Sequence, residues 1–194
     1  MTAIVAKSET KLKESIMQFV IERAPLLKSL GHVQSVVEKR GTIAVLSNVK
    51  NEAKGDGVEL TATDMDLAMI EKVPASVSKN GAITVPAHMF YDIVRKLPDG
   101  AQIECSVSED GGKMSISAGH SRFSLGCLPT ADFPVMADND LTHKFTLKAA
   151  ECRVLVEKPS FAISTEETRY YINGIFLHAS SSNDGKVLRA VATD

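Results

Sequence analysis

Two small groups of titratable side chains have the spacing that metal or acid–base chemistry could use. Asp64 and Asp66 are two residues apart, and such carboxylates could supply part of the oxygen shell of a divalent cation. His88 and Asp92 are four residues apart, so on a helix they would share one face and could transfer a proton. The sequence around them offers no further ligands, nucleophile elbow, phosphate loop or His-Glu-x-x-His pattern. We therefore interpret the first pair as a polar turn and the second as solvent-facing helix residues, and we expect no metal and no cofactor.

Basic side chains on predicted helices carry more information. Lys28 falls on the polar face of one helix, and His88 and Arg95, seven residues apart, share that of another. The net charge of -2 argues against a protein that grips DNA tightly. It still permits a thin basic lining on one surface, with ordinary solvated helix surface as the alternative interpretation.

Tyr170 and Tyr171 form the other notable cluster. We predict that they lie in a strand, where neighbouring side chains point to opposite faces, so that one packs and the other is exposed. An exposed tyrosine could contact a base or a phosphate. The alternative is that strands simply favour aromatic residues.

Hydrophobic periodicity, prolines and glycines predict three successive β-α units of an α+β protein. In the first unit, Pro25 begins a helix that runs through Val37 into a basic loop at 38–41. In the second, Pro86 begins a helix whose apolar positions are Met89, Phe90, Ile93, Val94 and Leu97. The predicted strands are 18–22, 42–50, 57–63 and 67–74 in the first unit, 82–85, 102–107, 113–118 and 121–125 in the second, and 144–147, 168–179 and 186–192 around a helix at 148–158 in the third.

An internal repeat supports a duplicated domain. Phe19-Val20-Ile21 corresponds to Phe145-Thr146-Leu147 at an offset of 126, and Ala62-Thr63-Asp64 corresponds to Ala192-Thr193-Asp194 at an offset of 130. We attribute the drift to a longer loop at 180–184. The expected organisation is an extension at 1–16, a first domain at 17–137, a linker at 138–143 and an incomplete second domain at 144–194. We expect the natural protein to be longer, because a chain that ends within a domain leaves a strand edge uncovered.

The cysteines and the hydropathy pattern indicate a cytoplasmic protein. Cys105, Cys127 and Cys152 are odd in number and lack Cys-x-x-Cys spacing, so we expect ordinary thiols. No apolar run approaches the roughly 20 residues that cross a membrane.

Several stretches resemble the family of bacterial DNA polymerase III β subunits, the sliding clamps. The most specific is Ser121-Arg122-Phe123-Ser124-Leu125 with Leu128-Pro129 and Ala131-Asp132-Phe133-Pro134. The other matching stretches are 17–21, 26–28, 84–100, 169–174 and 191–194.

The resemblance implies the DNA clamp fold, with repeated β-α-β-β-β units, helices lining a central channel and antiparallel sheets outside. It also implies three domains per chain, the third absent here, and a homodimeric ring that encircles double-stranded DNA. Such a ring is a non-catalytic processivity factor that the replicative DNA polymerase and the clamp loader bind through short peptide motifs, without a membrane. The alternatives are a stand-alone protein-interaction module of the same fold and an enzyme that uses Asp64, Asp66 or His88.

The resemblance also assigns residues. Together with Lys28 and Arg95, the expected DNA contacts are Arg40, His88, Glu166, Tyr170 and Tyr171. His88 stands where the family often has arginine, and Glu166 stands where it can have glutamine, so both departures weaken contact with phosphate. Ile172 and Thr193 match the partner-peptide groove. His120 and Arg122 match the dimer interface, within the segment 113–122 that, with the helix at 86–97, meets the partner chain.

Overall fold

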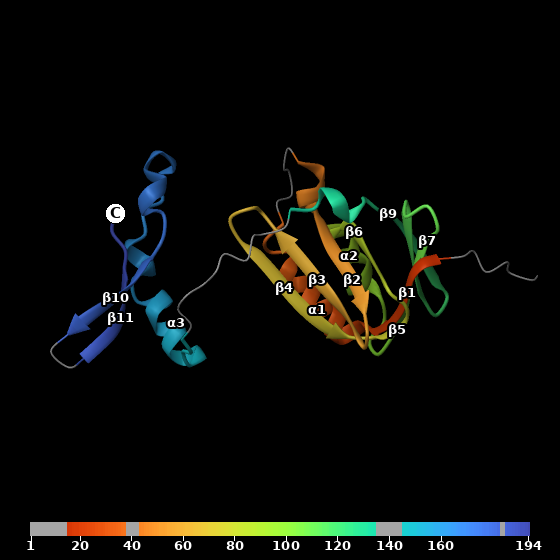
Figure 1. Cartoon of the computed structure of the whole chain (residues 1–194), viewed down its shortest axis with the longest axis horizontal. Helices are drawn as coiled ribbons and strands as arrows, with labels where there is room; N and C mark the ends of the chain where they lie inside the picture. Colours follow the sequence, from red (N-terminus) through yellow and green to blue (C-terminus); the bar gives the residue numbers. More distant parts are fainter. Residues whose placement is uncertain (1–14, 38–42, 135–144, 183–184) are drawn as a thin grey trace, which may run out of the picture. The chain divides into compact units, whose positions relative to one another are not determined.

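The computed structural model describes residues 15–37, 43–134, 145–182 and 185–194, which belong to two compact units, Met1–Ala137 and Asp138–Asp194 (Figure 1). In the described part of the chain, no helix has the length and hydropathy that a bilayer crossing requires.

The first half of unit 1 begins with a strand that starts three residues earlier than predicted. Its elements are β1 (Ser15–Glu22), α1 (Arg23–Val33), the 3-10 helix η1 (Ala44–Ser47), β2 (Asn48–Lys54), β3 (Gly57–Thr63) and β4 (Ala68–Pro74). The α1 helix ends at Val33, before the predicted Val37. The loop predicted at 38–41 lies outside the described residues.

The predicted strand at 42–50 is wrong, because the strand begins at Asn48 after a 3-10 turn. Two asparagines occupy core-facing positions of β2 that an apolar pattern does not reveal. The amide nitrogen of Asn48 donates to the Thr84 hydroxyl at 2.9 Å, and that of Asn51 donates to the Val49 carbonyl at 3.0 Å. These bonds let polar side chains be buried in the strand.

The second half of unit 1 contains one strand that the sequence did not predict. Its elements are β5 (Ser76–Lys79), β6 (Gly81–Pro86), α2 (Ala87–Lys96), β7 (Gln102–Ser108), β8 (Lys113–Ala118), β9 (Ser121–Gly126) and the 3-10 helix η2 (Thr130–Asp132). The new strand, β5, is short, polar and at a sheet edge, so it carries little hydrophobic signal. Met89, predicted on the apolar face of α2, is instead 56% exposed.

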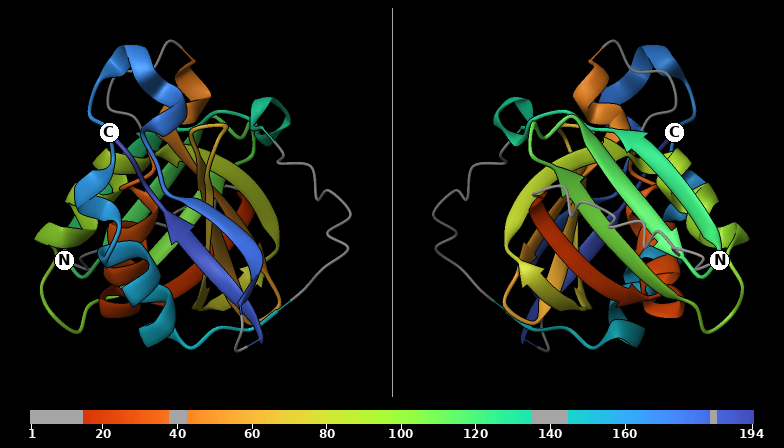
Figure 2. Two further views of the ribbon diagram at one scale, coloured as in Figure 1. Left: turned by 90° about the vertical axis from the view of Figure 1, so that its left-hand side faces the viewer. Right: turned by 90° about the vertical axis from the view of Figure 1, so that its right-hand side faces the viewer.

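The two halves of unit 1 exchange one strand each, β1 from the first half and β6 from the second. One antiparallel sheet has the order β5-β1-β7-β8-β9 and the other has the order β4-β3-β2-β6. In the right-hand view of Figure 2, red β1 lies beside the green strands of the second half. Each half therefore contributes a strand to the sheet of the other.

Helices α1 and α2 pack against each other and against these sheets. Helix α1 contacts β1, β3 and β4, and α2 contacts β2 and β6. The largest side chains with under 2% exposure are Phe19, Phe90, Met17, Ile21, Leu26, Leu30, Leu60, Ile103, Met114 and Ile116. Burial of this set is the main stabilising contribution to unit 1.

The described part of unit 2 follows the order of α1, η1, β2 and β3 in unit 1, with a helix, 3-10 turns and a β-hairpin. It contains α3 (Ala149–Glu157), the 3-10 helices η3 (Ser160–Ala162) and η4 (Glu167–Ile172), and the antiparallel strands β10 (Phe176–Ser182) and β11 (Gly185–Val191). In the β2–β3 hairpin Lys54 pairs with Gly57, and at offsets of 126 and 130 the matching pair of the β10–β11 hairpin is Ser180 with Val187. Residues 55–56 separate the first pair and residues 181–186 separate the second, so the four additional residues agree with the longer loop predicted at 180–184.

Two strand predictions for unit 2 are wrong. Residues 145–147 form no strand, whereas their counterpart β1 is paired on both sides by β5 and β7 from the second half of unit 1. Residues 167–172 form η4 rather than the start of a strand, as η1 precedes β2 in unit 1. At 145–147, the missing strand partners rather than the local sequence account for the difference from β1.

Candidate nucleic-acid interface

The outward face of α1 presents Lys28 to solvent and holds His32 in a local network. His32 Nδ1 lies 2.8 Å from a Glu71 carboxylate oxygen, and the Ser29 hydroxyl donates to the other oxygen at 3.2 Å. The His32 contact, supported by Ser29, holds the pKa of Glu71 below its ordinary value. The His32 ring thus faces a carboxylate of β4, while Lys28 presents its cation outward.

The outward face of α2 presents Arg95, but not as an isolated charge. Its guanidinium donates to the Asp92 carboxylate at 2.9 Å and lies 5.6 Å from the centre of the Tyr91 ring. Lys96 is exposed in the same last turn. The end of α2 is therefore basic, with part of its charge offset by Asp92.

His88 bridges α2 and the end of α1. Its Nδ1 lies 3.3 Å from the Gln34 side-chain oxygen, and its Nε2 lies 3.3 Å from the Val37 carbonyl oxygen. The predicted solvent-facing pair of His88 and Asp92 is therefore wrong, because His88 is half-buried and each residue has another partner. Arg40, the expected DNA contact of the adjoining loop, lies outside the described residues.

Tyr170 and Tyr171 are both exposed, at 80% and 73%, so the prediction that one packs is wrong. In η4 the two rings contact each other edge to face, with centroids 5.8 Å apart. The contact between the two rings places them side by side on one exposed surface of η4. Glu166 precedes this helix, and Arg169 lies 3.8 Å from its carboxylate. That contact offsets the negative charge that would repel a phosphate.

The two residues predicted for a peptide groove line one hollow of unit 2. Ile172 and Thr193 line a depression of about 330 Å³ with both tyrosines, Phe176 and Val191. Phe176 is 66% and Val191 is 42% exposed, so part of its wall is apolar and open to solvent. Such an open apolar surface can accept a short peptide.

The residues predicted for the dimer interface lie at the end of the five-stranded sheet. His120 is exposed in the turn between β8 and β9, after Gly119 at φ 58°, and Arg122 is exposed on β9. Within the described residues, β9 has a sheet neighbour only on its β8 side. Its other edge can pair with a strand from elsewhere.

The carboxylates considered for metal binding serve a turn. An Asp64 oxygen accepts from the backbone N–H of Asp66 at 3.0 Å and of Leu67 at 2.7 Å, between β3 and β4. Across the described ranges, no three His, Cys, Asp or Glu side chains gather as a metal site. The polar-turn interpretation of Asp64-Met65-Asp66 is confirmed.

The three thiols have no shared environment. Burial raises the pKa of the Cys105 thiol, and it raises that of the half-buried Cys127 to about 11. Cys152 is exposed on α3. All three are free, as expected for ordinary thiols.

Arg23 is a residue of this surface that the sequence analysis missed. It is the first residue of α1, where a positive charge opposes the helix dipole. That placement is a sequence signal, because a cation at a helix start needs acceptors from elsewhere. The structure supplies these acceptors from the end of α2 and the loop that follows it.

Comparisons with known proteins agree with this architecture. The family model described as DNA polymerase III beta subunit, N-terminal domain, matches residues 17–137. A beta sliding clamp of Caulobacter vibrioides is 51% identical over 178 residues, which are 92% of this chain and 48% of that protein. The beta sliding clamp of Escherichia coli K12 is 38% identical over 179 residues, which are 92% of this chain and 47% of that protein.

Solved structures of such proteins share the fold. A Caulobacter crescentus beta sliding clamp superposes with a TM-score of 0.89 at 50% identity, covering 92% of this chain and 47% of that one. A Pseudomonas aeruginosa DNA polymerase III subunit beta superposes with a TM-score of 0.84 at 38% identity, with the same coverage. The predicted α+β clamp fold is confirmed. The chain spans about half the length of the relatives it matches.

Proposed function

The chain belongs to the DNA polymerase III beta subunit family, and from that premise we propose that the whole protein is a DNA polymerase processivity factor. In this proposal it is a ring-shaped sliding clamp that encircles duplex DNA and tethers the replicative polymerase. The observation that carries the proposal is the 51% identity to a beta sliding clamp over 92% of the chain. The protein would act without catalysis, in the cytoplasm where the chromosome is copied.

The charges on the helix surfaces suit a contact that must slide. Lys28 and Arg95 offer cations to phosphates, while Asp92 offsets part of the Arg95 charge. Each phosphate that a protein neutralises strengthens binding and increases its salt dependence. Few and partly offset cations would give weak contacts, so that retention depends on the closed ring. We propose Arg40, His88, Glu166, Tyr170 and Tyr171 as further residues on the DNA side.

The hollow at Ile172 and Thr193 is proposed as part of the groove for partner peptides. Its open apolar wall would receive hydrophobic side chains of a short motif from the polymerase or the clamp loader. The open edge of β9, with His120 and Arg122, is proposed to meet a second copy of the chain. An edge strand with exposed basic residues favours a partner strand that carries acidic ones.

Retention on circular DNA tests the proposal. The full-length protein is loaded by its clamp loader onto nicked circular DNA, and bound protein is measured before and after the DNA is cut once. An encircling clamp stays on circles and is lost from linear molecules. Equal retention on both would show ordinary site binding, and no retention on either would favour a stand-alone interaction module.

A further inference from the structure

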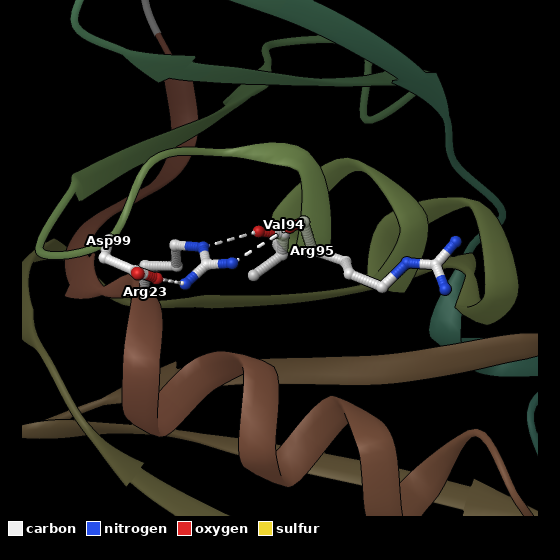
Figure 3. Close-up of polar contacts among 4 residues, drawn as sticks. All are labelled: Arg23, Val94, Arg95 and Asp99. Carbon is white, nitrogen blue, oxygen red and sulfur yellow. Dashed lines mark hydrogen bonds and ion pairs between the residues drawn. The ribbon is translucent and has the colours of Figure 1, made fainter.

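Arg23 ties the beginning of α1 to the end of α2 through three acceptors (Figure 3). Its Nε donates to the Val94 carbonyl at 3.0 Å and its Nη2 donates to the Arg95 carbonyl at 2.9 Å. Its Nη1 donates to the Asp99 carboxylate. The Arg23 side chain is only 13% exposed, whereas that of Asp99 is 97% exposed. The two carbonyl bonds are thus the more shielded part of the contact.

The bond to the Arg95 carbonyl satisfies a group at the end of α2, whereas the Val94 carbonyl also accepts from the backbone N–H of Leu97 at 3.3 Å. The last carbonyls of a helix have no intrahelical donors, and a cation there also complements the helix dipole. The backbone N–H of Arg23 donates in addition to the Ala101 carbonyl at 3.0 Å. One residue therefore fixes both the last turn of α2 and the loop that follows it.

The held carbonyl belongs to Arg95, whose side chain leaves the helix in the opposite direction from Arg23 (Figure 3). A bond to that carbonyl limits rotation and fraying of the last turn, and so limits where the Arg95 guanidinium can lie. The geometry of the donor is also specific, because a guanidinium presents its N–H groups in one rigid plane. The corresponding first residue of α3 is Ala149, so unit 2 lacks this contact.

We propose that Arg23 is a positioning residue for the DNA-facing end of α2: it holds the Val94 and Arg95 carbonyls and thereby directs the Arg95 guanidinium toward phosphate. This inference rests on the proposed function. Arg23 itself does not touch DNA in this proposal. Its effect on DNA binding passes through Arg95 alone.

A double-mutant cycle in the full-length protein tests the dependence. Arg23→Lys keeps the charge and the aliphatic stem, but one ammonium cannot replace the three nitrogens of the fork. Binding to a short fluorescent duplex is measured over a series of salt concentrations for Arg23→Lys, Arg95→Gln and the double variant. Arg189→Lys, the same change at an exposed position of β11, is the matched control.

The slope of log affinity against log salt concentration is negative. We expect Arg95→Gln to reduce the magnitude of this slope by about 1, which corresponds to the loss of one phosphate contact. Arg23→Lys should lower it by a similar amount, and the double variant should lose no more than Arg95→Gln alone. Hydrogen exchange at the amides of the last turn of α2 should rise in Arg23→Lys and stay unchanged in Arg189→Lys. Additive losses, or an unchanged slope in Arg23→Lys, would overturn the inference.

Asp99→Asn separates the ion pair from the carbonyl bonds and remains informative if Arg23→Lys folds poorly. It removes the exposed charge and leaves both carbonyl acceptors, so the slope should not change. A loss as large as that of Arg95→Gln would overturn the inference, because the ion pair would then be the working contact. If wild-type protein is retained on circles but the losses in the mutant cycle are additive, only the positioning role of Arg23 is rejected. Equal retention on circular and linear DNA rejects the proposed function itself.

Discussion

The first half of unit 1 and the described part of unit 2 share a helix followed by a 3-10 turn and a β-hairpin, but they differ in what they bury. In unit 1, β1, α1 and the β2–β3 hairpin contribute Phe19, Leu30 and Leu60 to a core in which each is at most 1% exposed. In unit 2, the corresponding α3 and β10–β11 leave Val154 at 46% and Phe176 at 66% exposed. The difference shows that this repeat does not bury its own apolar face. The exchange of β1 and β6 between two halves is what closes the core.

Truncation of a large aromatic side chain should give the largest difference between the units. Phe90 is fully buried in α2, so Phe90→Ala removes contacts and leaves a cavity, at a cost of about 3–5 kcal/mol. Phe161 is 90% exposed in unit 2, so Phe161→Ala should change stability by less than about 0.5 kcal/mol. Urea denaturation, monitored by hydrogen exchange at the amides of β7 and β10, measures the change in stability for both variants. Similar costs would mean that unit 2 has a core of its own.

Substitution of a glycine should give the next largest difference in stability between the units, because two strands of unit 1 approach each other closely at Gly81. A Cβ on Gly81 would lie 2.8 Å from Met17 Cβ and 2.9 Å from the Ile16 carbonyl oxygen, where β6 passes β1. We expect Gly81→Ala to cost about 1–3 kcal/mol through overpacking.

Gly174→Ala is the control in unit 2, since its Cβ would meet no atom within 4 Å. Its unfolding free energy should stay within about 0.5 kcal/mol of the wild type. Thermal and urea unfolding of both variants give the comparison. A neutral Gly81→Ala would show that β1 and β6 can move apart at little cost.

The acid dependence of unit 1 should show that α1 is tied to a sheet. The contact with His32 holds the pKa of Glu71 below its ordinary value of 4.5, so the ionised form stabilises the fold. This contribution is present above the unfolded-state pKa and is lost as the pH falls through the lower folded-state pKa. Because both side chains are partly exposed, Glu71→Gln should cost about 0.5–1 kcal/mol at neutral pH.

The matched control is Glu157→Gln on α3, whose carboxylate pairs at 2.6 Å with Arg153 of the same helix. An exposed pair within one helix contributes roughly 0.3–0.5 kcal/mol, so this change should be smaller. Unfolding free energies are compared at neutral pH and below pH 4.5. A Glu71→Gln penalty that persists unchanged in acid would contradict the assignment to the ionised carboxylate.

The smallest expected effects concern DNA binding by the full-length protein, where the units should contribute different chemistry. Lys28→Gln removes a cation from α1 and should lower the salt slope by about 1 without changing stability. Tyr170→Phe removes only a hydroxyl, so affinity should fall about two- to tenfold with the slope unchanged. Fluorescence anisotropy across a salt series distinguishes them. An altered slope in Tyr170→Phe would mean that η4 acts through charge.

Much of the fold follows from local pattern. The bounds of β3 and β8 and the helix after Pro86 were predicted because alternation and prolines act within a few residues. The candidate site residues also divide into those that the sequence could place and those whose contacts only the tertiary structure shows. Ile172 and Thr193 could be placed on one surface through the resemblance, whereas the partners of His88 at Gln34 and Val37 come from the turn that follows α1.

The sequence by itself determined the α+β class, the repeated β-α order and the family, because these depend on periodicity and on motifs that are contiguous in the chain. Only the tertiary structure decided which strands pair, and it therefore decided that 145–147 forms no strand, that Asn48 and Asn51 are buried in β2, and that both tyrosines are exposed. It also revealed the contact of Arg23 with α2, 71 and 72 residues away along the chain. Pairing and capping across such separations depend on where the backbone brings groups together, and no local pattern in the sequence encodes that distance.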